Sequence, residues 1–218
     1  MNKFNRDLVI QTLQKVVEVL EENHVEYRII GSVVVAAING KLHRKLGDMD
    51  LIIDIGKKDV LYKALKSLGY KEAKGKVFAF GRKYYCLETL DHQELLEVGY
   101  FYGTWQKDGS FLIGNKYVNV CIEDIAVKET EYKLHGIRFK GIPKRIAATN
   151  IMTSKSNPKR QSELLILKKK NIAPSPNNFI HINIFGVNAD WMYHFGVAIL
   201  NTWGNIRVKL GLAFDPWR

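Results

Sequence analysis

Residues 27–54 read YRIIGSVVVAAINGKLHRKLGDMDLIID, and the rest of the chain is organised around this stretch. Its two apolar runs, residues 27–30 and 48–53, have the length and composition of short strands. The glycine and serine at positions 31 and 32 separate the first run from a predicted helix over residues 33–38, which should end at Asn39-Gly40 with a left-handed cap. The stretch therefore predicts a strand, a tight turn, a helix and a second strand.

Two acidic residues in the second predicted strand, Asp48 and Asp50, are expected to lie on the same face, because side chains alternate along a strand. Met49, Leu51 and Ile53 would then point the other way, into a core. Two neighbouring carboxylates repel each other and raise each other's pKa, and a divalent cation removes that cost. Oxygen ligands of this kind suit Mg²⁺ or Mn²⁺. The pattern therefore predicts a metal site formed by Asp48 and Asp50.

The turn before the helix has features of a phosphate site. Gly31 allows the backbone to approach an anion closely, and Ser32 adds a hydroxyl group at the start of a helix, where backbone N–H groups favour negative charge. A simpler interpretation makes Ser32 a helix N-cap and residues 48–53 a solvated edge strand. That interpretation does not readily explain why both aspartates share one face.

Taken together, Gly31-Ser32, Arg44 and Asp48-x-Asp50 resemble the signature of the polymerase β-like nucleotidyltransferase superfamily, and the resemblance covers roughly residues 5–170. It implies an α+β nucleotidyltransferase fold, with a mixed β-sheet, helices packed on one side of it and further C-terminal helices. Small members of the superfamily, of the lincosamide-modifying type or of the abortive-infection and toxin type, are the most similar in pattern. Gly47 stands where such proteins often have serine or threonine.

The superfamily also has a third carboxylate on a later strand. Glu97 lies in an apolar run within the predicted strand 93–101, and the resemblance therefore implies that it is the third metal ligand and a catalytic residue with Asp48 and Asp50. Aspartate is more usual at this position, so glutamate is a departure. Glu94 is the alternative, but it lies closer to the preceding turn.

The resemblance further implies a set of nucleotide-binding residues. Arg44 matches an arginine that supports the site, and Lys155, Lys159 and Arg160 match basic residues of two covering helices that face the nucleotide. We expect Glu163, where the superfamily commonly has aspartate, to be structural. His43 is expected to be a solvated loop residue. The predicted nucleotide-binding set is Gly31, Ser32, Arg44, Lys155, Lys159 and Arg160.

Composition limits the class of protein. The chain has 218 residues, of which 46 % are hydrophobic and 25 % charged, enough for one sizeable core or a domain with an appendage. Cys86 and Cys121 form neither a disulfide framework nor a zinc-binding spacing, which fits a reducing cytoplasm. No signal peptide or long apolar run indicates export or membrane insertion. We therefore expect a cytoplasmic protein.

Positive charge is concentrated in one part of the chain. The net charge is +11, and residues 127–170 hold 12 Lys or Arg against 3 Asp or Glu. Such a block is typical of a surface that binds phosphate-rich partners, although a solvated basic face explains it equally well.

The pattern predicts two parts. Residues 1–170 form the nucleotidyltransferase domain, with a core over about residues 5–125 and covering helices over about 143–170, and residues 171–218 form an aromatic-rich extension of unknown role. Further predicted elements are helices over 5–22, 57–68, 143–153 and from 157 onward, strands over 76–80, 82–88, 116–122 and 179–185, a hairpin element over 131–139, a turn at 89–92 and a turn-rich loop over 103–114. The extension would pack as extra strands, mediate oligomerisation or be loosely ordered.

The function implied by the resemblance is Mg²⁺-dependent transfer of a nucleoside monophosphate from an NTP to an acceptor hydroxyl group, with release of pyrophosphate. The acceptor would be a small molecule such as an antibiotic, or an RNA or protein if the chain is toxin-like and has an antitoxin partner. The alternative from a different class is a non-catalytic nucleic-acid-binding or protein-binding module built on the same fold. The complete set of three acids favours the enzyme.

Overall fold

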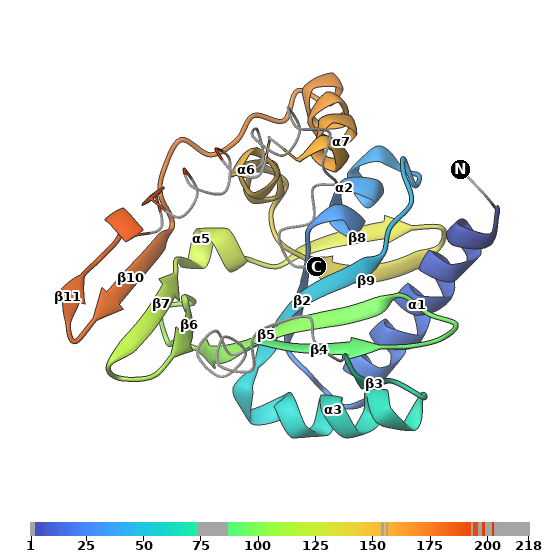
Figure 1. The fold of residues 1–218 in the computed structure, drawn as a ribbon, viewed down its shortest axis with the longest axis horizontal. Coiled ribbons are helices and arrows are strands. Elements are labelled where there is room, and N and C mark those ends of the chain that lie inside the picture. The colour runs from blue at the N-terminus through green and yellow to red at the C-terminus, as the bar shows by residue number, and fades with distance from the viewer. Residues whose placement is uncertain are drawn as a thin grey trace.

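The computed structural model describes residues 3–73, 87–153, 155, 157–192, 194–195, 198 and 202 (Figure 1). Its helices are α1 Lys3–Glu22, α2 Ser32–Asn39, the 3₁₀ turn η1 Ile55–Lys57, α3 Lys58–Ser67, α5 Asp124–Val127, α6 Lys144–Thr153 and α7 Pro158–Lys169. Its strands are β1 Tyr27–Ile30, β2 Asp48–Asp54, β3 Lys71–Glu72, β4 Leu87–Asp91, β5 Glu97–Trp105, β6 Phe111–Gly114, β7 Val118–Ile122, β8 Thr130–Leu134, β9 Ile137–Gly141, β10 Ile180–Ile184 and β11 Val187–Asn188.

The described strands form one mixed sheet in the order β11-β10-β7-β6-β5-β2-β1-β9-β8, with β4 and β3 attached beside β5. At its centre, β2 pairs antiparallel with β1 and parallel with β5. Helices and strands are thus combined as the α+β prediction requires, and the predicted mixed sheet is confirmed.

The two faces of β2 have different surroundings. Met49, Leu51 and Ile53 are almost completely buried in the main core, together with apolar side chains of α1 and α3. Ile52 points to the opposite face, where it packs with Phe111 and Val127. Because Asp48 and Asp50 alternate with the core residues, they lie on the same face as Ile52. In Figure 1, α1 and α3 lie on the lower side of the sheet, and α2, α6 and α7 gather at the top.

One local prediction in the organising stretch is confirmed: Gly40 caps α2 in the left-handed conformation, with φ 76° and its N–H bonded to the carbonyl of Ala37. Asp54 accepts a hydrogen bond from the Gly56 N–H at 2.7 Å and caps the 3₁₀ turn η1.

The predictions around β5 were partly wrong. β4 continues through Asp91, so residues 89–91 are strand and not turn, and β5 begins at Glu97 and extends through Trp105, beyond the predicted end at 101. The expected loop over 103–114 is largely a hairpin between β5 and β6. Gly103 misled the prediction: it permits close strand pairing here, since a Cβ atom at this position would lie 2.4 Å from the Leu112 carbonyl oxygen. The predicted strand over 76–80 lies outside the described residues. So do residues 82–86 of the predicted strand over 82–88.

The C-terminal extension adds strands to the sheet in its described part. β10 pairs antiparallel with β7, and β11 pairs with β10. His181 on β10 holds this region through both ring nitrogens, 2.9 Å from Asp190 Oδ2 and 2.9 Å from Glu123 Oε1. Trp203 and Trp217 lie outside the described residues.

The contacts of His181 predict that the stability of this region depends weakly on pH. The contacts with Glu123 and then Asp190 raise the pKa of His181 above its ordinary value, so the charged form stabilises the fold below the unfolded pKa and the benefit is lost as pH rises through the raised pKa. Because the side chains are 35 %, 44 % and 22 % exposed, solvent screening limits the effect to about 1 kcal/mol or less. Hydrogen exchange of the β10 amides should therefore be faster at pH 8 than at pH 6, after correction for intrinsic rates. His181→Gln should remove the difference; an unchanged pH dependence in that variant would contradict the assignment.

Candidate active site

The acidic residues meet where β1 ends and β2 and β5 begin. In the strand register Asp48 lies opposite Glu97, and Asp50 lies between Ile30 of β1 and Gly99 of β5. Paired residues on neighbouring strands direct their side chains to the same face. The three predicted catalytic acids therefore share one face and one edge of the sheet centre, Asp48 exposed and the other two half-buried.

Asp50 is the most strongly perturbed of the three carboxyl groups. Burial, followed by the charge of Asp48 and, to a smaller extent, that of Glu97, raises its pKa to about 7, although the positive charge of Arg160 opposes the change. The folded protein thus holds a carboxyl group that resists ionisation near neutral pH. A bound cation would reverse this effect, since a nearby positive charge favours the carboxylate.

These residues suit a hard divalent cation in chemistry, since all three offer carboxylate oxygens. As the side chains stand, no group of three or more His, Cys, Asp or Glu in the described part of the chain is close enough together to hold a metal ion. The electrostatic coupling of Asp50 to Asp48 and Glu97 nevertheless marks an acidic cluster that a cation would stabilise. The fit is therefore one of donor type and charge, with the acids adjusting on binding.

Two glycines give the Asp50 carboxylate its space. A Cβ atom at Gly99 would lie 2.8 Å from Asp50 Oδ1, which is too close, and one at Gly31 would lie 3.8 Å from Asp50 Oδ2. Gly31 also has φ 72°, a conformation that L side chains rarely adopt. Any larger residue at position 99 would displace the acid, so this glycine is a site residue that sequence reasoning missed.

The hydroxyl group of Ser32, at the start of α2, joins three elements. It accepts hydrogen bonds from Arg44 Nη2 at 2.6 Å and from Arg160 Nη1 at 2.9 Å. Both arginines also bind Glu163, Arg44 through Nε and Nη2 at 3.1 and 2.9 Å and Arg160 through Nη1 at 2.9 Å. This Ser32–Arg44–Arg160–Glu163 network connects the helix N-terminus, the loop before β2 and helix α7.

Glu163 is the centre of this network and its side chain is fully buried. Burial alone would raise its pKa, but the contact with His43 and the charge and hydrogen bond of Arg160 outweigh burial and lower the pKa to about 2. Glu163 is therefore ionised throughout the physiological range. The structural role expected for it is compatible with this position, but the residue also orients two basic side chains beside the acidic cluster.

His43 corrects another expectation. The sequence predicted a solvated loop histidine, whereas its side chain is only 6 % exposed and its Nε2 lies 3.5 Å from Glu163 Oε1. A basic loop is normally solvated, and nothing in the local sequence signals that a residue 120 positions away would bury this one.

Lys155 and Lys159 complete the predicted nucleotide-binding set. Lys155 lies in the exposed turn between α6 and α7. Lys159 belongs to the first turn of α7, and its side chain lies outside the described atoms. Within α7, Arg160 is the residue that the structure brings to the acidic cluster, because its charge acts on Asp50.

Comparison with known proteins identifies the class of this fold. Residues 12–110, slightly less than half of the chain, match the family model described as aminoglycoside-2″-adenylyltransferase. Among solved structures, the lincosamide antibiotic adenylyltransferase LnuA with lincomycin bound is 19 % identical with a TM-score of 0.62, over 75 % of this chain and 98 % of that one. ANT(2″)-Ia in complex with adenylyl-2″-tobramycin is 12 % identical with a TM-score of 0.55, over 91 % and 98 % of the two chains. No curated protein matches the sequence.

The Gly31-Ser32 and Asp48-x-Asp50 motifs both lie within the residues that match this adenylyltransferase family model. The structural matches at this level of identity establish the shared fold. No helix in the described part of the chain is long and apolar enough to cross a membrane.

Proposed function

We propose that the protein transfers a nucleoside monophosphate from an NTP to a hydroxyl group of a small-molecule acceptor and releases pyrophosphate. The observation that carries the proposal is the meeting of two units: the acidic cluster on β2 and β5, and the arginine-serine network at the N-terminus of α2. One unit suits a metal-bound triphosphate, and the other suits its outer phosphates.

The phosphates would bind at the start of α2. The first backbone N–H groups of a helix lack intrahelical partners and attract anions. Arg160 would supply positive charge to the triphosphate from α7. Arg44 already donates to Ser32, Glu163 and the Lys45 carbonyl, so its role is to position Ser32 and Glu163 more than to contact phosphate directly.

Asp48, Asp50 and Glu97 would hold the divalent cation, Mg²⁺ or Mn²⁺, which when bound lowers the pKa of the acceptor hydroxyl group and offsets charge on the departing pyrophosphate. Asp50, with its raised pKa, would become ionised beside that positive charge.

A small-molecule acceptor is favoured over RNA or protein. The description of the matched family names an aminoglycoside, and the two structural neighbours were solved with lincomycin and with adenylyl-2″-tobramycin. An antitoxin partner, a cytoplasmic location and oligomerisation through the extension stay predictions. A non-catalytic module is not favoured, because the acids, Gly31 and Gly99, and the Ser32–Arg44–Arg160–Glu163 network lie together.

The test uses the purified full chain. Thermal unfolding should shift upward with ATP, GTP, CTP or UTP only when Mg²⁺ or Mn²⁺ is present, since a ligand that binds only the folded state raises its stability. Pyrophosphate release should then depend on an added acceptor such as lincomycin or tobramycin. Absence of any metal-dependent nucleotide effect with all four NTPs would contradict the proposed function.

Glu97 provides a sharper prediction. Glu97→Gln should lower kcat by about 10²-fold or more, the size seen when one electrostatic stabiliser is lost, because the amide cannot neutralise a cation. Glu94→Gln is the matched control: Glu94 is exposed in the bend before β5 and should retain near wild-type kcat. Steady-state kinetics of both variants decide the assignment, and the reverse pattern would place the third acid at residue 94.

A further inference from the structure

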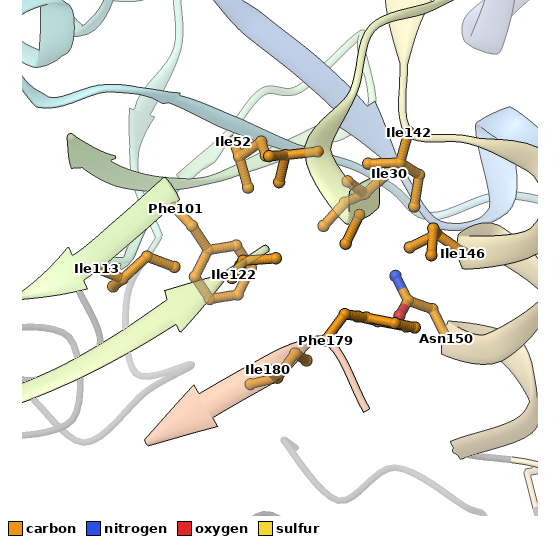
Figure 2. A pocket seen from close by; sticks show the side chains of 12 residues that line it. Ile30, Ile52, Phe101, Ile113, Ile122, Ile142, Ile146, Asn150, Phe179 and Ile180 are labelled. Carbon is orange, nitrogen blue, oxygen red and sulfur yellow. The ribbon is translucent and has the colours of Figure 1, made fainter. Parts of the chain in front are cut away.

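An apolar cavity of about 170 Å³ lies next to the acidic cluster, and neither the family match nor the predicted site residues account for it. Its floor contains Ile30, Ile52 and Phe101 from β1, β2 and β5 (Figure 2). Ile30 is the strand partner of Asp50, and Ile52 follows Asp50 by two residues and pairs with Phe101. Two residues along a strand span about 7 Å on the same face, so the cavity begins one side chain away from the acids.

The walls come from elements that close over this face. Helix α6 contributes Ile146 and Asn150, and Phe179 and Ile180 lie on the opposite side at the start of β10. Figure 2 shows the Asn150 amide between Ile146 and Phe179 at the edge of this space. Of the twelve described residues that line the cavity, Asn150 alone is polar.

The lining determines the chemistry of the occupant. A nucleobase or a phosphate would leave several polar groups without partners in such a cavity, which costs free energy for each group. A charged ammonium group would be still less favourable, and helices α6 and α7 belong to the segment 127–170 that already carries a net charge of +9. The cavity therefore suits a neutral apolar substituent with at most one hydrogen-bonding group.

The size determines how much of a ligand enters. A cavity of ~150 Å³ lined by apolar side chains is known to hold one benzene ring. A whole antibiotic needs several hundred Å³, on the order of the 300–1,000 Å³ of ordinary ligand pockets. The cavity thus has room for one ring or short alkyl chain of a larger molecule whose hydroxyl group reaches the acids.

We propose that this cavity binds an apolar substituent of the acceptor, and that it selects neutral acceptors carrying a ring or alkyl group near the reacting hydroxyl over polycationic aminoglycosides. This inference rests on the proposed function, since the occupant is the acceptor of that reaction. It departs from the description of the matched family, whose named substrate is an aminoglycoside.

Asn150 permits a test with little change in shape. Asn150→Asp places a negative charge at the cavity edge, and Asn150→Leu makes the lining fully apolar at similar volume. Met152→Asp, on an exposed position of the same helix, is the control for added charge. The assay uses lincomycin as acceptor and ATP–Mg²⁺ as donor. Asn150→Asp should raise the acceptor KM roughly 10- to 100-fold, which is the loss expected for one buried ring-sized apolar group. The ATP KM should stay within about twofold of the wild-type value. Asn150→Leu should keep the acceptor KM near the wild-type value or lower it, and tobramycin should be the poorer acceptor.

A binding measurement separates this inference from the proposed function. Phenyl β-glucoside and glucose share the sugar and differ in the ring, and ligand-observed NMR should detect binding of the phenyl compound alone by the wild type and not by Asn150→Asp. Such binding without transfer would leave the cavity assignment intact and overturn the proposed reaction. Transfer with an unchanged acceptor KM in Asn150→Asp, a change confined to the ATP KM, or a preference for tobramycin would overturn the inference and leave the reaction standing.

Discussion

Asp50→Asn is expected to lower nucleotidyl transfer by about 10³-fold or more and, in the absence of metal, to make the folded protein more stable at neutral pH. The loss of activity follows from removing an anionic ligand from the proposed metal site, where a cation contributes several kcal/mol to the transition state. The gain in stability follows from removing a carboxyl group that the fold holds in an unfavourable environment. A residue that only packs in the core would not combine a loss of activity with a gain in stability.

The direction of the pH effect can be worked out from the pKa of Asp50. An unfolded aspartate has a pKa of about 3.9, whereas burial and the charge of Asp48 raise the folded value to about 7. Between these pH values the unfolded chain has released a proton that the folded chain retains, so the free energy of unfolding falls as pH rises. About three pKa units correspond to at most ~4 kcal/mol by pH 8. The contribution of Asp50 to stability is therefore most favourable in mild acid and declines toward neutrality.

Urea unfolding at pH 5 and pH 8, with and without Mg²⁺, measures this effect. Wild type should lose stability between the two pH values without metal and regain part of it with metal, whereas Asp50→Asn should respond little to either. Asp48→Asn should also abolish transfer, with a smaller change in stability because Asp48 is exposed. Asp7→Asn, on the exposed surface of α1, serves as the control. Retained transfer in either variant would show that the metal site lies elsewhere.

The acidic half of the site was predictable because its information is local. The alternation of Asp48 and Asp50 with Met49, Leu51 and Ile53 needs only the two-residue period of a strand, and the structure has this alternation. Placing Glu97 beside them required the resemblance, since parallel pairing of β2 with β5 is not encoded in either strand alone. The geometry of the acids thus combines a local pattern with a superfamily expectation.

The basic half was predictable only in part because its contacts are distant in sequence. Ser32 and Arg160 are 128 residues apart, and Arg44 and Glu163 are 119 apart. No periodicity links such positions, so a lone glutamate in α7 reads as an ordinary helix residue. Gly99 was missed for a related reason: a glycine in a strand is informative only when the side chain that fills its space, here Asp50, is known.

Glu163→Gln is expected to destabilise the protein by about 3–5 kcal/mol, the range observed when one partner of a buried ion pair is removed. Its carboxylate is fully buried and receives hydrogen bonds from Arg44 and Arg160. Glutamine keeps the size but not the charge, so two partly buried guanidinium groups, with side chains 19 % and 25 % exposed, would lose their counter-ion. The expected effect on the free energy of unfolding is thus opposite in sign to that of Asp50→Asn.

The pH dependence of stability also tests the role of Glu163 as a buried counter-ion. The pKa of Glu163 is about 2, below the ~4.3 of an unfolded glutamate, so its contribution is fully present above the unfolded value and is lost as pH falls from there through about 2. Wild type should therefore lose more stability than Glu163→Gln between pH 5 and pH 3 in urea unfolding. Glu131→Gln, on the exposed side of β8, is the matched control.

A nucleotide measurement then separates support of the fold from support of the site. If Glu163 orients Arg160 and Ser32 for phosphate, Glu163→Gln should weaken ATP–Mg²⁺ binding by about tenfold or more at a temperature where the variant is still folded, since the freed arginines are no longer held at the start of α2. Unchanged ATP affinity would confine Glu163 to stability, because a network that positions phosphate-binding groups cannot lose its central anion without moving them.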